Sequence, residues 1–432
     1  MSATALRTDS PPAWVRSSTY RLLPRGAAED SSFASHVERY GPLPLLSGLR
    51  TSLLREVESS GLTGRGGGGF PTAVKLRTVA GGRSPVVVAN GTEGEPASSK
   101  DAVLMTFNPH LVVDGILAGM AVVGSDEAYV AVSRTARSAQ AALSAALAER
   151  RRETRRIQVV AVPDRFVAGE ESALVHWLNG GDAKPTITPP RPFERGVRGR
   201  ATLVQNVETL ANIALIARHG AGWFRERGTR SEPGTALVTV RGTVARPGVV
   251  EVELGTTLCR VLERCGGPTA PARAFLVGGY FGTWIDAGSN LDLRLSDAAL
   301  QPLGAALGAR TLAVLPRGTC GLAETARIAR YLAGESAGQC GPCVFGLPAV
   351  ADALETVAAS RPDARRALER LPRLAAQIAG RGACGHPDGA VRLVDSALRV
   401  FAPEVESHLG GVCRAEHREP LLPTAHETTD WR

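Results

Sequence analysis

The sequence predicts three consecutive units: an α/β domain with a mostly parallel sheet, a small α+β domain and a C-terminal four-helix bundle. Strands that alternate with helices up to about residue 225 indicate the first unit. A change to period-two alternation of apolar residues after residue 235 indicates the second. Successive amphipathic helical patterns indicate the bundle. At 432 residues, the chain is long enough for each unit to have its own core.

The α/β domain begins with an amphipathic helix over 47–60, which is followed by a glycine loop and a helix with Pro71 near its first position. Short β-branched runs, typical of buried parallel strands, then alternate with helical patterns. Strands are predicted over 84–91, 127–133 and 156–163, and helices over 110–124, 139–150 and 171–180. In such a sheet, ligands bind at the carboxyl ends of the strands.

The second and third units follow a turn-rich segment over 228–234. The α+β domain combines alternating strands with a helix over 258–267 and strands over 274–281 and 282–287. Four helices are predicted over 322–334, 347–360, 364–380 and 390–410. The predicted boundaries are a tail over 1–46, the α/β domain over 47–228, the α+β domain over 236–305, the bundle over 315–412 and a tail over 413–432.

Composition argues against nucleic-acid binding and membrane insertion. The formal charge is +8, but the basic residues are scattered, and the cluster over 149–156 fits a solvated helix face. No apolar run approaches the roughly 20 residues of a membrane span, and no secretory signal is visible. We therefore expect a cytoplasmic protein, which could lie at the periphery of a membrane complex. Only three basic residues are lysines, which suggests that Lys75 and Lys100 serve where a compact ammonium is required.

The glycine loop over 64–69 joins two predicted helices. It matches the spacing G-x-G-x-x-G from Gly64 to Gly69, but the dinucleotide-binding fingerprint requires a strand directly before it. The backbone N–H groups of such a loop can approach a phosphate or flavin closely, and Arg65 and Lys75 add positive charge. A flexible loop without a ligand is the alternative.

Two acidic turns follow predicted strands. The turn over 90–96 contains Glu93 and Glu95, which could bind ribose hydroxyls or a nicotinamide amide. The turn over 168–172 places a glycine and two acids at the start of a helix. Acids in a first helical turn are favourable without any ligand, so a solvated acidic turn is an equally good interpretation of each.

Three of the seven cysteines lie on two loops of the predicted bundle. Cys340 and Cys343 form a C-x-x-C within ESAGQCGPC, and Cys384 lies in a later turn between helices. In an up-and-down bundle both turns can lie at one end, which would bring the three thiolates together. This arrangement favours an iron–sulfur cluster over a thioredoxin-like dithiol, which needs a βαβ context. A structural zinc site is the competing interpretation.

The chain resembles the flavin-binding NADH-oxidising subunit of respiratory complex I, which is the F subunit of NADH-quinone oxidoreductase, and the related diaphorase subunits of NAD-linked hydrogenases and formate dehydrogenases. The resemblance is carried by GLTGRGGGGFPTAVK, ANGTEGEPASSKD, GEESAL, NVETLANI, ESAGQCGPC and the spaced Cys384, and it runs from about residue 47 to 409. It implies a divergent paralogue with a Rossmann-like FMN domain, a β-grasp (soluble-ligand-binding) domain and a helical bundle that holds a [4Fe–4S] cluster.

The resemblance also implies which residues bind the cofactor and substrate. FMN would be held by Gly64, Arg65, Gly66, Gly67, Lys75, Asn90, Glu93, Gly169, Glu170, Glu171, Asn206 and Thr209. Phe70, Glu95 and Phe166 would line the NADH site, with Phe166 in the place of a family tyrosine. Thr92, Gly94 and Gln205 depart from the family pattern.

The predicted metal ligands are Cys340, Cys343, Cys384 and His386, because the first of the family's four cysteines corresponds to Ala337 here. His386 follows Cys384 closely, and imidazole ligation of iron–sulfur clusters has precedent. An exogenous or absent ligand ranks second. Cys320 ranks third, because the helix after it would place it ~18 Å away; Cys413 would lie ~30 Å away. A histidine ligand is expected to raise the reduction potential and to couple it to pH.

The predicted function is that of an FMN-dependent NADH dehydrogenase or diaphorase. Electrons would pass from NADH or NADPH through flavin to an iron–sulfur cluster and on to a ferredoxin, a thioredoxin-like [2Fe–2S] subunit or complex I-like subunits. No catalytic proton donor is predicted, because hydride transfer depends on how the protein orients nicotinamide and flavin. Two alternatives remain: a degenerate paralogue that acts as a binding or scaffold module without turnover, and a zinc-stabilised ligand-binding protein.

Overall fold

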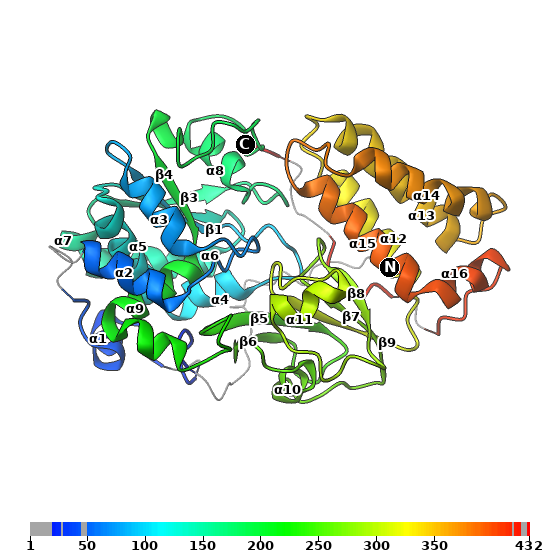
Figure 1. Ribbon diagram of the computed structural model, residues 1–432, viewed down its shortest axis with the longest axis horizontal. Helices are drawn as coiled ribbons and strands as arrows, with labels where there is room; N and C mark the ends of the chain where they lie inside the picture. The colour runs from blue at the N-terminus through cyan, green and yellow to red at the C-terminus, as the bar shows by residue number, and fades with distance from the viewer. Residues whose placement is uncertain (1–19, 27–28, 45–49, 417–418, 425–429) are drawn as a thin grey trace.

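The computed structural model describes residues 20–26, 29–44, 50–416, 419–424 and 430–432, which form three lobes (Figure 1). The α/β domain lies at the left of the view, a smaller sheet domain at the lower centre and the helical region at the right. The predicted order of an α/β domain, a second small domain and a C-terminal helical region is therefore confirmed.

A four-stranded parallel sheet forms the centre of the α/β domain, in the order β3-β2-β1-β4. Its strands are β1 (Val86–Gly91), β2 (Ala128–Ser133), β3 (Ile157–Val162) and β4 (Thr202–Asn206). Alternate residues of β1 enter different apolar clusters, Val87 on one face of the sheet and Val88 on the other, so both faces are buried. The three predicted strands are present. The short β4, which the sequence did not predict, is the second neighbour of β1.

The order of the strands places a topological switch point between β1 and β4. The chain passes from β1 to β2 and β3 on one side, whereas β4 pairs with β1 on the other. Asn90 and Asn206 are register partners at the carboxyl ends of these two strands. Because the crossovers from β1 to β2 and from β3 to β4 lead to opposite sides of β1, a crevice forms at the strand ends, and open α/β sheets bind ligands there.

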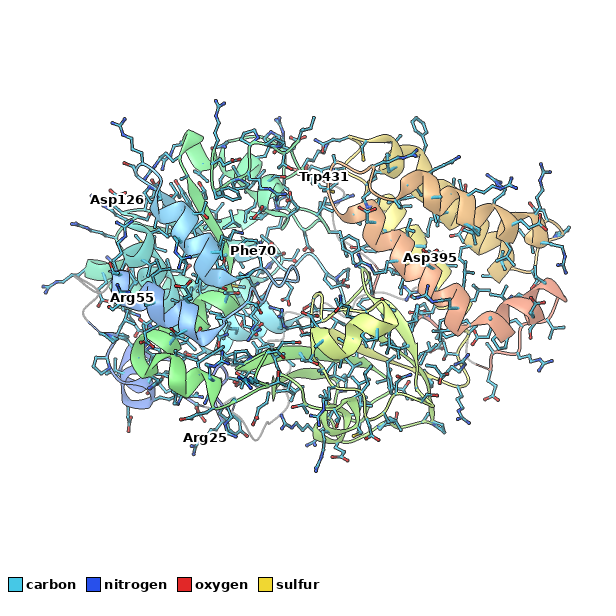
Figure 2. All side chains as sticks on the ribbon, viewed as in Figure 1. Arg25, Arg55, Phe70, Asp126, Asp395 and Trp431 are labelled. Carbon is cyan, nitrogen blue, oxygen red and sulfur yellow. The ribbon has the colours of Figure 1, made fainter. Side chains whose placement is uncertain are left out.

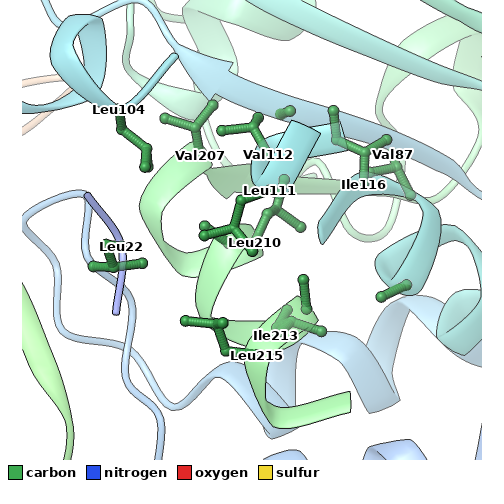
Figure 3. Packing of buried hydrophobic residues seen from close by; sticks show 14 of the residues in the cluster. Leu22, Val87, Leu104, Leu111, Val112, Ile116, Val207, Leu210, Ile213 and Leu215 are labelled. Carbon is green, nitrogen blue, oxygen red and sulfur yellow. The ribbon is translucent and has the colours of Figure 1, made fainter. Parts of the chain in front are cut away.

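Helices cover both faces of this sheet. They are α1 (Phe33–Tyr40), α2 (Arg50–Ser60), α3 (Thr72–Ala80), α4 (Lys100–Phe107), α5 (Pro109–Val123), α6 (Arg137–Glu149), α7 (Arg151–Thr154), α8 (Glu171–Leu178), the 3₁₀ turn η1 (Val197–Gly199) and α9 (Val207–Arg225). Leu111 and Ile116 of α5 pack beside Leu210 of α9 (Figure 3). A Cβ on Gly115 would lie 2.2 Å from the carbonyl oxygen of Leu210, so these helices pack closely only with glycine there.

The predicted helices over 110–124, 139–150 and 171–180 correspond to α5, α6 and α8. The helix predicted over 47–60 corresponds to α2, and residues 47–49 lie outside the described part of the chain. No single described helix has the length and apolar composition needed to cross a membrane, whereas α4 and α5 meet both criteria only as a pair, bent by 98°.

The predicted tails are partly folded onto the domains. Of the segments 1–46 and 413–432, the structure describes 20–26, 29–44, 413–416, 419–424 and 430–432, and the rest lies outside the described residues. Leu22 and Leu23 are buried, and their backbone N–H groups donate to one carboxylate oxygen of Glu251 at 3.0 and 3.2 Å. Apolar burial and this buried acceptor explain why Leu22 and Leu23 pack against the domains.

The second domain is a five-stranded mixed sheet in the order β6-β5-β9-β7-β8. Its elements are β5 (Thr235–Gly242), β6 (Gly248–Glu253), α10 (Leu258–Arg264), β7 (Ala272–Val277), β8 (Thr283–Asp286), α11 (Asp297–Leu300), the 3₁₀ turn η2 (Gln301–Leu303) and β9 (Thr311–Pro316). The central β9 pairs parallel with β5 and antiparallel with β7. The domain therefore ends beyond residue 316, and not at residue 305 as predicted. The short apolar run over 311–316 did not reveal its strand partners, because they are distant in the sequence.

The helical region contains five described helices rather than the predicted four. They are α12 (Gly321–Gly334), α13 (Leu347–Ala358), α14 (Ala364–Ile378), α15 (His386–Val400) and α16 (Ala402–Leu409), with a π turn, η3 (Pro342–Gly346), before α13. The helix predicted over 390–410 is divided at Phe401, which is buried against Trp284 with ring centroids 5.2 Å apart. Pro403 has no backbone N–H to continue the hydrogen bonding of α15, but it is tolerated in a first turn, so a new helix starts at Ala402.

Helix α15 attaches the helical region to the second domain. The backbone N–H of Trp284, in β8, donates to the Ser396 hydroxyl at 3.0 Å. A Cβ on Gly389 would lie 2.2 Å from the ring of Phe281. The helix and the sheet edge are thus in close contact, which sets where the amino-terminal end of α15 lies.

Glu251→Ala is expected to lower the free energy of unfolding by about 1–3 kcal/mol, because it leaves the buried N–H groups of residues 21–23 without their acceptor. Glu253→Ala is the matched control on the same strand. It removes a partly exposed ion pair with Arg227 and should cost less than about 1 kcal/mol. Denaturant unfolding of both variants tests this, and equal destabilisation would contradict the role assigned to Glu251.

Candidate functional site

The glycine loop lies against the carboxyl end of β4. The backbone N–H of Arg65 donates to the Thr209 hydroxyl at 2.8 Å. A Cβ on Gly66 would lie 3.1 Å from the Cβ of Asn206, and Gly67 has a φ of 110°, which favours glycine. The loop residues and the start of α9, predicted from separate motifs, therefore meet at the switch point.

The guanidinium of Arg65 faces the interior and is 1% exposed. It donates to the Pro233 carbonyl at 3.2 Å and to the Thr63 hydroxyl at 3.3 Å. Burial, and then the neighbouring Arg310, lower the pKa of Arg65 to about 9. Arg310 in turn donates to the Arg65 carbonyl at 2.6 Å. Arg65 therefore anchors the loop from the interior of the domain, and in this structure the positive charge that it was expected to add beside a ligand faces the Pro233 carbonyl.

Lys75, on α3, reaches the start of α8. Its Nζ lies 2.8 Å from Oε2 of Glu171, and both side chains remain partly exposed. The neighbouring Glu170 caps α8 by accepting the backbone N–H groups of Ser172 at 2.9 Å and Ala173 at 3.1 Å. Burial raises the pKa of Glu170. The second acidic turn thus combines a helix cap with an accessible ammonium–carboxylate pair beside the glycine loop.

Asn90 ties the first acidic turn to the second. Its Nδ2 donates to the Gly169 carbonyl at 2.8 Å, and its Oδ1 accepts the Thr92 hydroxyl at 2.7 Å. A Cβ on Gly169 would lie 2.3 Å from Oγ1 of Thr92, so the turns approach too closely for any side chain at that position. Asn90, Thr92 and Gly169 therefore form one wall of the crevice.

Glu93 has both carboxylate oxygens engaged at the start of α4. One accepts the Ser98 hydroxyl at 2.6 Å and the Asp101 N–H at 3.1 Å, and the other accepts the Ala102 N–H at 3.0 Å. Desolvation, and then the nearby Asp101, raise the pKa of Glu93 to about 6. This carboxylate caps a helix, and the interpretation as a solvated acidic turn is wrong for it.

Glu95 connects the α/β domain to the second domain. Its Oε2 accepts the backbone N–H of Tyr280 at 2.8 Å, in the turn between β7 and β8. A Cβ on Gly279 would lie 2.5 Å from the same oxygen. Although Glu95 keeps some accessible surface, neighbouring atoms enclose its carboxylate, and this desolvation raises its pKa to about 7. Its main contact in the structure is therefore with the second domain.

A buried charge network lies under the crevice, and the sequence indicated only one of its members. Lys100 Nζ contacts Asp101 at 2.6 Å and Glu208 at 2.9 Å. Asn206 donates to the second oxygen of Asp101 at 2.7 Å, and Glu208 accepts the backbone N–H of Leu237 at 3.0 Å. The rarity of lysine in this chain marked Lys100, and its first partner, Asp101, is the next residue of α4. No local pattern identified the second partner, Glu208, which lies at the start of α9.

Phe70 and Phe166, both predicted to line the NADH site, lie in different surroundings. Phe70 ends the glycine loop and is 53% exposed (Figure 2). Phe166 packs between the domains, with its ring centroid 4.7 Å from Phe281 and 5.6 Å from His386. Its backbone N–H donates to Glu335 at 2.9 Å. Of the two rings, Phe70 presents the open aromatic face.

The three predicted thiols lie together at one end of the helical region. Cys340, Cys384 and Ser336 all lie close enough to Cys343 to affect the pKa of its thiol. Burial, and then the neighbouring Cys340 and Cys384, raise the pKa of Cys343 to about 12. Burial also raises the pKa of Cys384, and the carboxylate of Glu170 contributes to that increase. His386, two residues after Cys384, packs against Phe166 in the turn before α8, so this end of the helical region faces the α/β domain.

His386 is enclosed beside these thiols. Its Nε2 lies 2.8 Å from the Leu332 carbonyl, and burial lowers its pKa to about 4. The neutral ring therefore donates from Nε2, which leaves a lone pair on Nδ1, and Nδ1 is buried without a hydrogen-bond partner among the described residues. Three thiols and one unpartnered imidazole nitrogen suit an iron–sulfur cluster, while Ala337 provides no donor atom.

Three family models match the chain in the order of its domains. The Nuo51 FMN-binding domain matches residues 57–215, the SLBB domain matches 237–279, and the NADH-ubiquinone oxidoreductase-F iron-sulfur binding region matches 323–408. The first match contains the glycine loop and both acidic turns. The last contains the three thiols and His386.

Relatives with known names agree with these matches. The F subunit of NADH-quinone oxidoreductase from Streptomyces coelicolor is 32% identical over 374 residues, with 83% of each chain covered. The protein of the same name from Mycobacterium tuberculosis is 31% identical over 389 residues, covering 85% of this chain and 86% of the relative.

The crystal structure of the NAD⁺-reducing [NiFe]-hydrogenase in the H2-reduced state is similar, with a TM-score of 0.77 and 31% identity. The match covers 84% of this chain but 64% of the hydrogenase chain, so this chain spans about two thirds of that length. On these similarities, the chain belongs to the family formed by the F subunits of NADH-quinone oxidoreductase.

Proposed function

We propose that this chain oxidises NADH with a bound FMN and passes the electrons, through an iron–sulfur cluster in its helical region, to an iron–sulfur partner protein. The observation that carries the proposal is the adjacency of two sites from different domains. Phe166, in the turn before α8, packs against His386 with ring centroids 5.6 Å apart, and the neighbouring Arg165 pairs with Glu335 at 3.0 Å. Membership of the family supports NADH, FMN and a [4Fe–4S] cluster as substrate and cofactors.

The residues present fit FMN at the switch point. FMN, when bound, accepts a hydride and releases single electrons, which the cluster can carry onward. The glycines of the loop leave its backbone open to close approach, and Lys75 offers a partly exposed cation suited to a phosphate. Asn90, Asn206 and Thr209 hydrogen-bond to the surrounding backbone and hold it in place. These contacts pre-organise the crevice, which lowers the entropy lost on binding.

We propose that Phe70 provides the aromatic surface for NADH, because its ring is open at the end of the glycine loop. Glu95 and Phe166 would hold the domains around the crevice in place. Glu95 contacts the second domain, and Phe166 contacts the helical region. The main role of the protein is then to orient NADH against the flavin and to exclude water.

We assign the five-stranded sheet to the β-grasp class, because the parallel pair β5 and β9 lies at its centre with α10 across one face. We describe the helical region as a four-helix bundle of α12 to α15, extended by the short α16. These assignments agree with the predicted architecture and rest on strand order and packing.

The proposed partner is a small [2Fe–2S] protein of the ferredoxin or thioredoxin-like type. Phe345 is 76% exposed and Val344 is 41% exposed, directly after the buried Cys343. Exposed apolar side chains beside a redox site suit a protein that docks there to receive electrons. The relatives are named as subunits of NADH-quinone oxidoreductase, in keeping with a role inside a larger assembly.

The proposed function is tested on protein purified without oxygen and reconstituted with FMN, iron and sulfide. We expect a flavin absorption band that NADH bleaches, together with partial loss of the broad iron–sulfur absorbance. A parallel addition of NADPH shows which of the two nicotinamide nucleotides reduces the flavin. A preparation that binds neither FMN nor iron, although it is folded by circular dichroism, would contradict the proposal and favour a scaffold module.

Lys75→Gln is expected to weaken FMN binding roughly 10–100-fold, because a hydrogen bond to a charged group contributes about 1.5–3 kcal/mol. Arg77→Gln is the matched control, since Arg77 lies on the same helix and pairs with Glu58 at the surface. Quenching of flavin fluorescence during titration measures both dissociation constants. If the two variants bound FMN equally well, Lys75 would not contact its phosphate.

We propose that Nδ1 of His386 completes the cluster, and His386→Ala is then expected to lower iron from about four to about three per chain. Iron analysis and the electron paramagnetic resonance signal of an oxidised three-iron cluster measure this. His219→Ala, in the α/β domain, should leave iron unchanged. Loss of iron in Ser336→Ala but not in His386→Ala would assign the fourth position to the hydroxyl beside Ala337 instead.

A further inference from the structure

A second sulfur-containing group lies at the other end of the helical region. Cys320 precedes α12, His408 lies in the last turn of α16, and Cys413 follows that helix. Their ligand atoms all lie within 4.8 Å of one another, and no other group of His, Cys, Asp or Glu in the described part of the chain meets that condition. Helix α12 has 14 residues, so this group lies about 20 Å along it from the loop of Cys340.

The side chains are already oriented as metal ligands. His408 Nδ1 lies 3.1 Å from the Ser360 hydroxyl, and its Nε2 lies 3.3 Å from Cys320 Sγ. When Nδ1–H donates to Ser360, the lone pair of Nε2 faces the two sulfurs, as in the outer hydrogen bonds of metal-bound histidines. Burial lowers the pKa of His408, which keeps the ring neutral.

The surroundings of Cys320 stabilise its thiolate form only weakly. The backbone N–H of Ala323, at the start of α12, donates to its Sγ at 3.3 Å. Burial nevertheless raises the pKa of Cys320 to about 12, so the thiol stays protonated when nothing else compensates its charge. A divalent cation supplies that compensation, because a coordinating thiol loses its proton outright.

We propose that Cys320, His408 and Cys413 bind a Zn²⁺ ion at this end of the helical region. Two thiolates and one imidazole are ligands that zinc prefers, and the two thiolates balance its charge. Tetrahedral zinc places its ligand atoms roughly 3.3–3.8 Å apart, so the three side chains need only small rotations from their present separations. The fourth position faces a cavity of about 400 Å³, lined by Cys320, Cys413 and Ser360, which has room for a water ligand.

The ion would join three segments: the start of α12, the end of α16 and the C-terminal segment of the chain. That segment returns along α12, where Leu422 N–H donates to Glu324 at 2.9 Å and Arg327 donates to Thr424 at 2.7 Å. Removing the ion should therefore lower thermal stability. It should not change the iron content that Cys340, Cys343 and Cys384 support.

The first test is metal analysis of the full-length protein after anaerobic purification from zinc-supplemented cells. We expect about one zinc per chain, and an at least tenfold lower content in Cys413→Ser and in His408→Asn. Cys259→Ser, a thiol of the second domain, should keep its zinc. Cys343→Ser should lose iron and keep zinc, so a failure here is distinguishable from a failure of the proposed cluster.

The second test uses the unsubstituted chain, so it holds even if a variant does not fold. After removal of zinc by a chelator, Co²⁺ should give the visible bands of a tetrahedral thiolate site and saturate at about one equivalent. Addition of Zn²⁺ should abolish these bands and raise the thermal midpoint. Absent cobalt bands, or zinc content unaffected by Cys413→Ser and His408→Asn, would overturn the proposal. So would a Cys320–Cys413 disulfide, seen as a mass two hydrogens lower in the chain isolated without reductant.

Discussion

The buried contact of Lys100 with Asp101 and Glu208 is the interaction on which the arrangement of the first two domains depends. Each of these charges is almost fully buried, and removal of one partner would leave the others uncompensated, at a cost of about 3–5 kcal/mol. Asn206 joins this network at the end of β4, and Leu237 joins it from the second domain. The floor of the crevice and the position of the second domain are therefore held by the same charges.

The helical region is brought to the crevice by a small set of contacts around Phe166. The ion pair of Arg165 with Glu335, at 3.0 Å, attaches the loop that leads to Cys340 to the turn that precedes α8. His386 packs against the same aromatic ring at the start of α15. Electron transfer between two centres needs proximity but no shared proton or covalent bond. Rigid packing at this junction is therefore the main contribution that the protein can make to that step.

The two sulfur sites of the helical region share helix α12. Cys320 lies before its first residue, and Cys340 follows its end by a short loop. The length of this helix keeps Cys320 away from the cluster thiols and places it at the opposite end of the bundle. Cys413 meets it there because α16 and the chain after it turn back toward the start of α12. A zinc ion at that end would stabilise the helix that positions the cluster loop.

The sequence by itself determined the order of the domains, the buried strands around Asn90, and the three thiols, because periodicity and motif spacing are local properties. Only the tertiary structure decided that Arg65 turns inward, because its partner Pro233 lies far along the chain. It also decided that Glu93 caps α4, because the turn after β1 must fold back before the carboxylate can reach the N–H groups at the start of that helix. The same holds for β9, whose place between β5 and β7 follows from pairing over long separations. Cys320 and Cys413 meet for this reason too: the folding of helices, and not their periodicity, brings the two residues together.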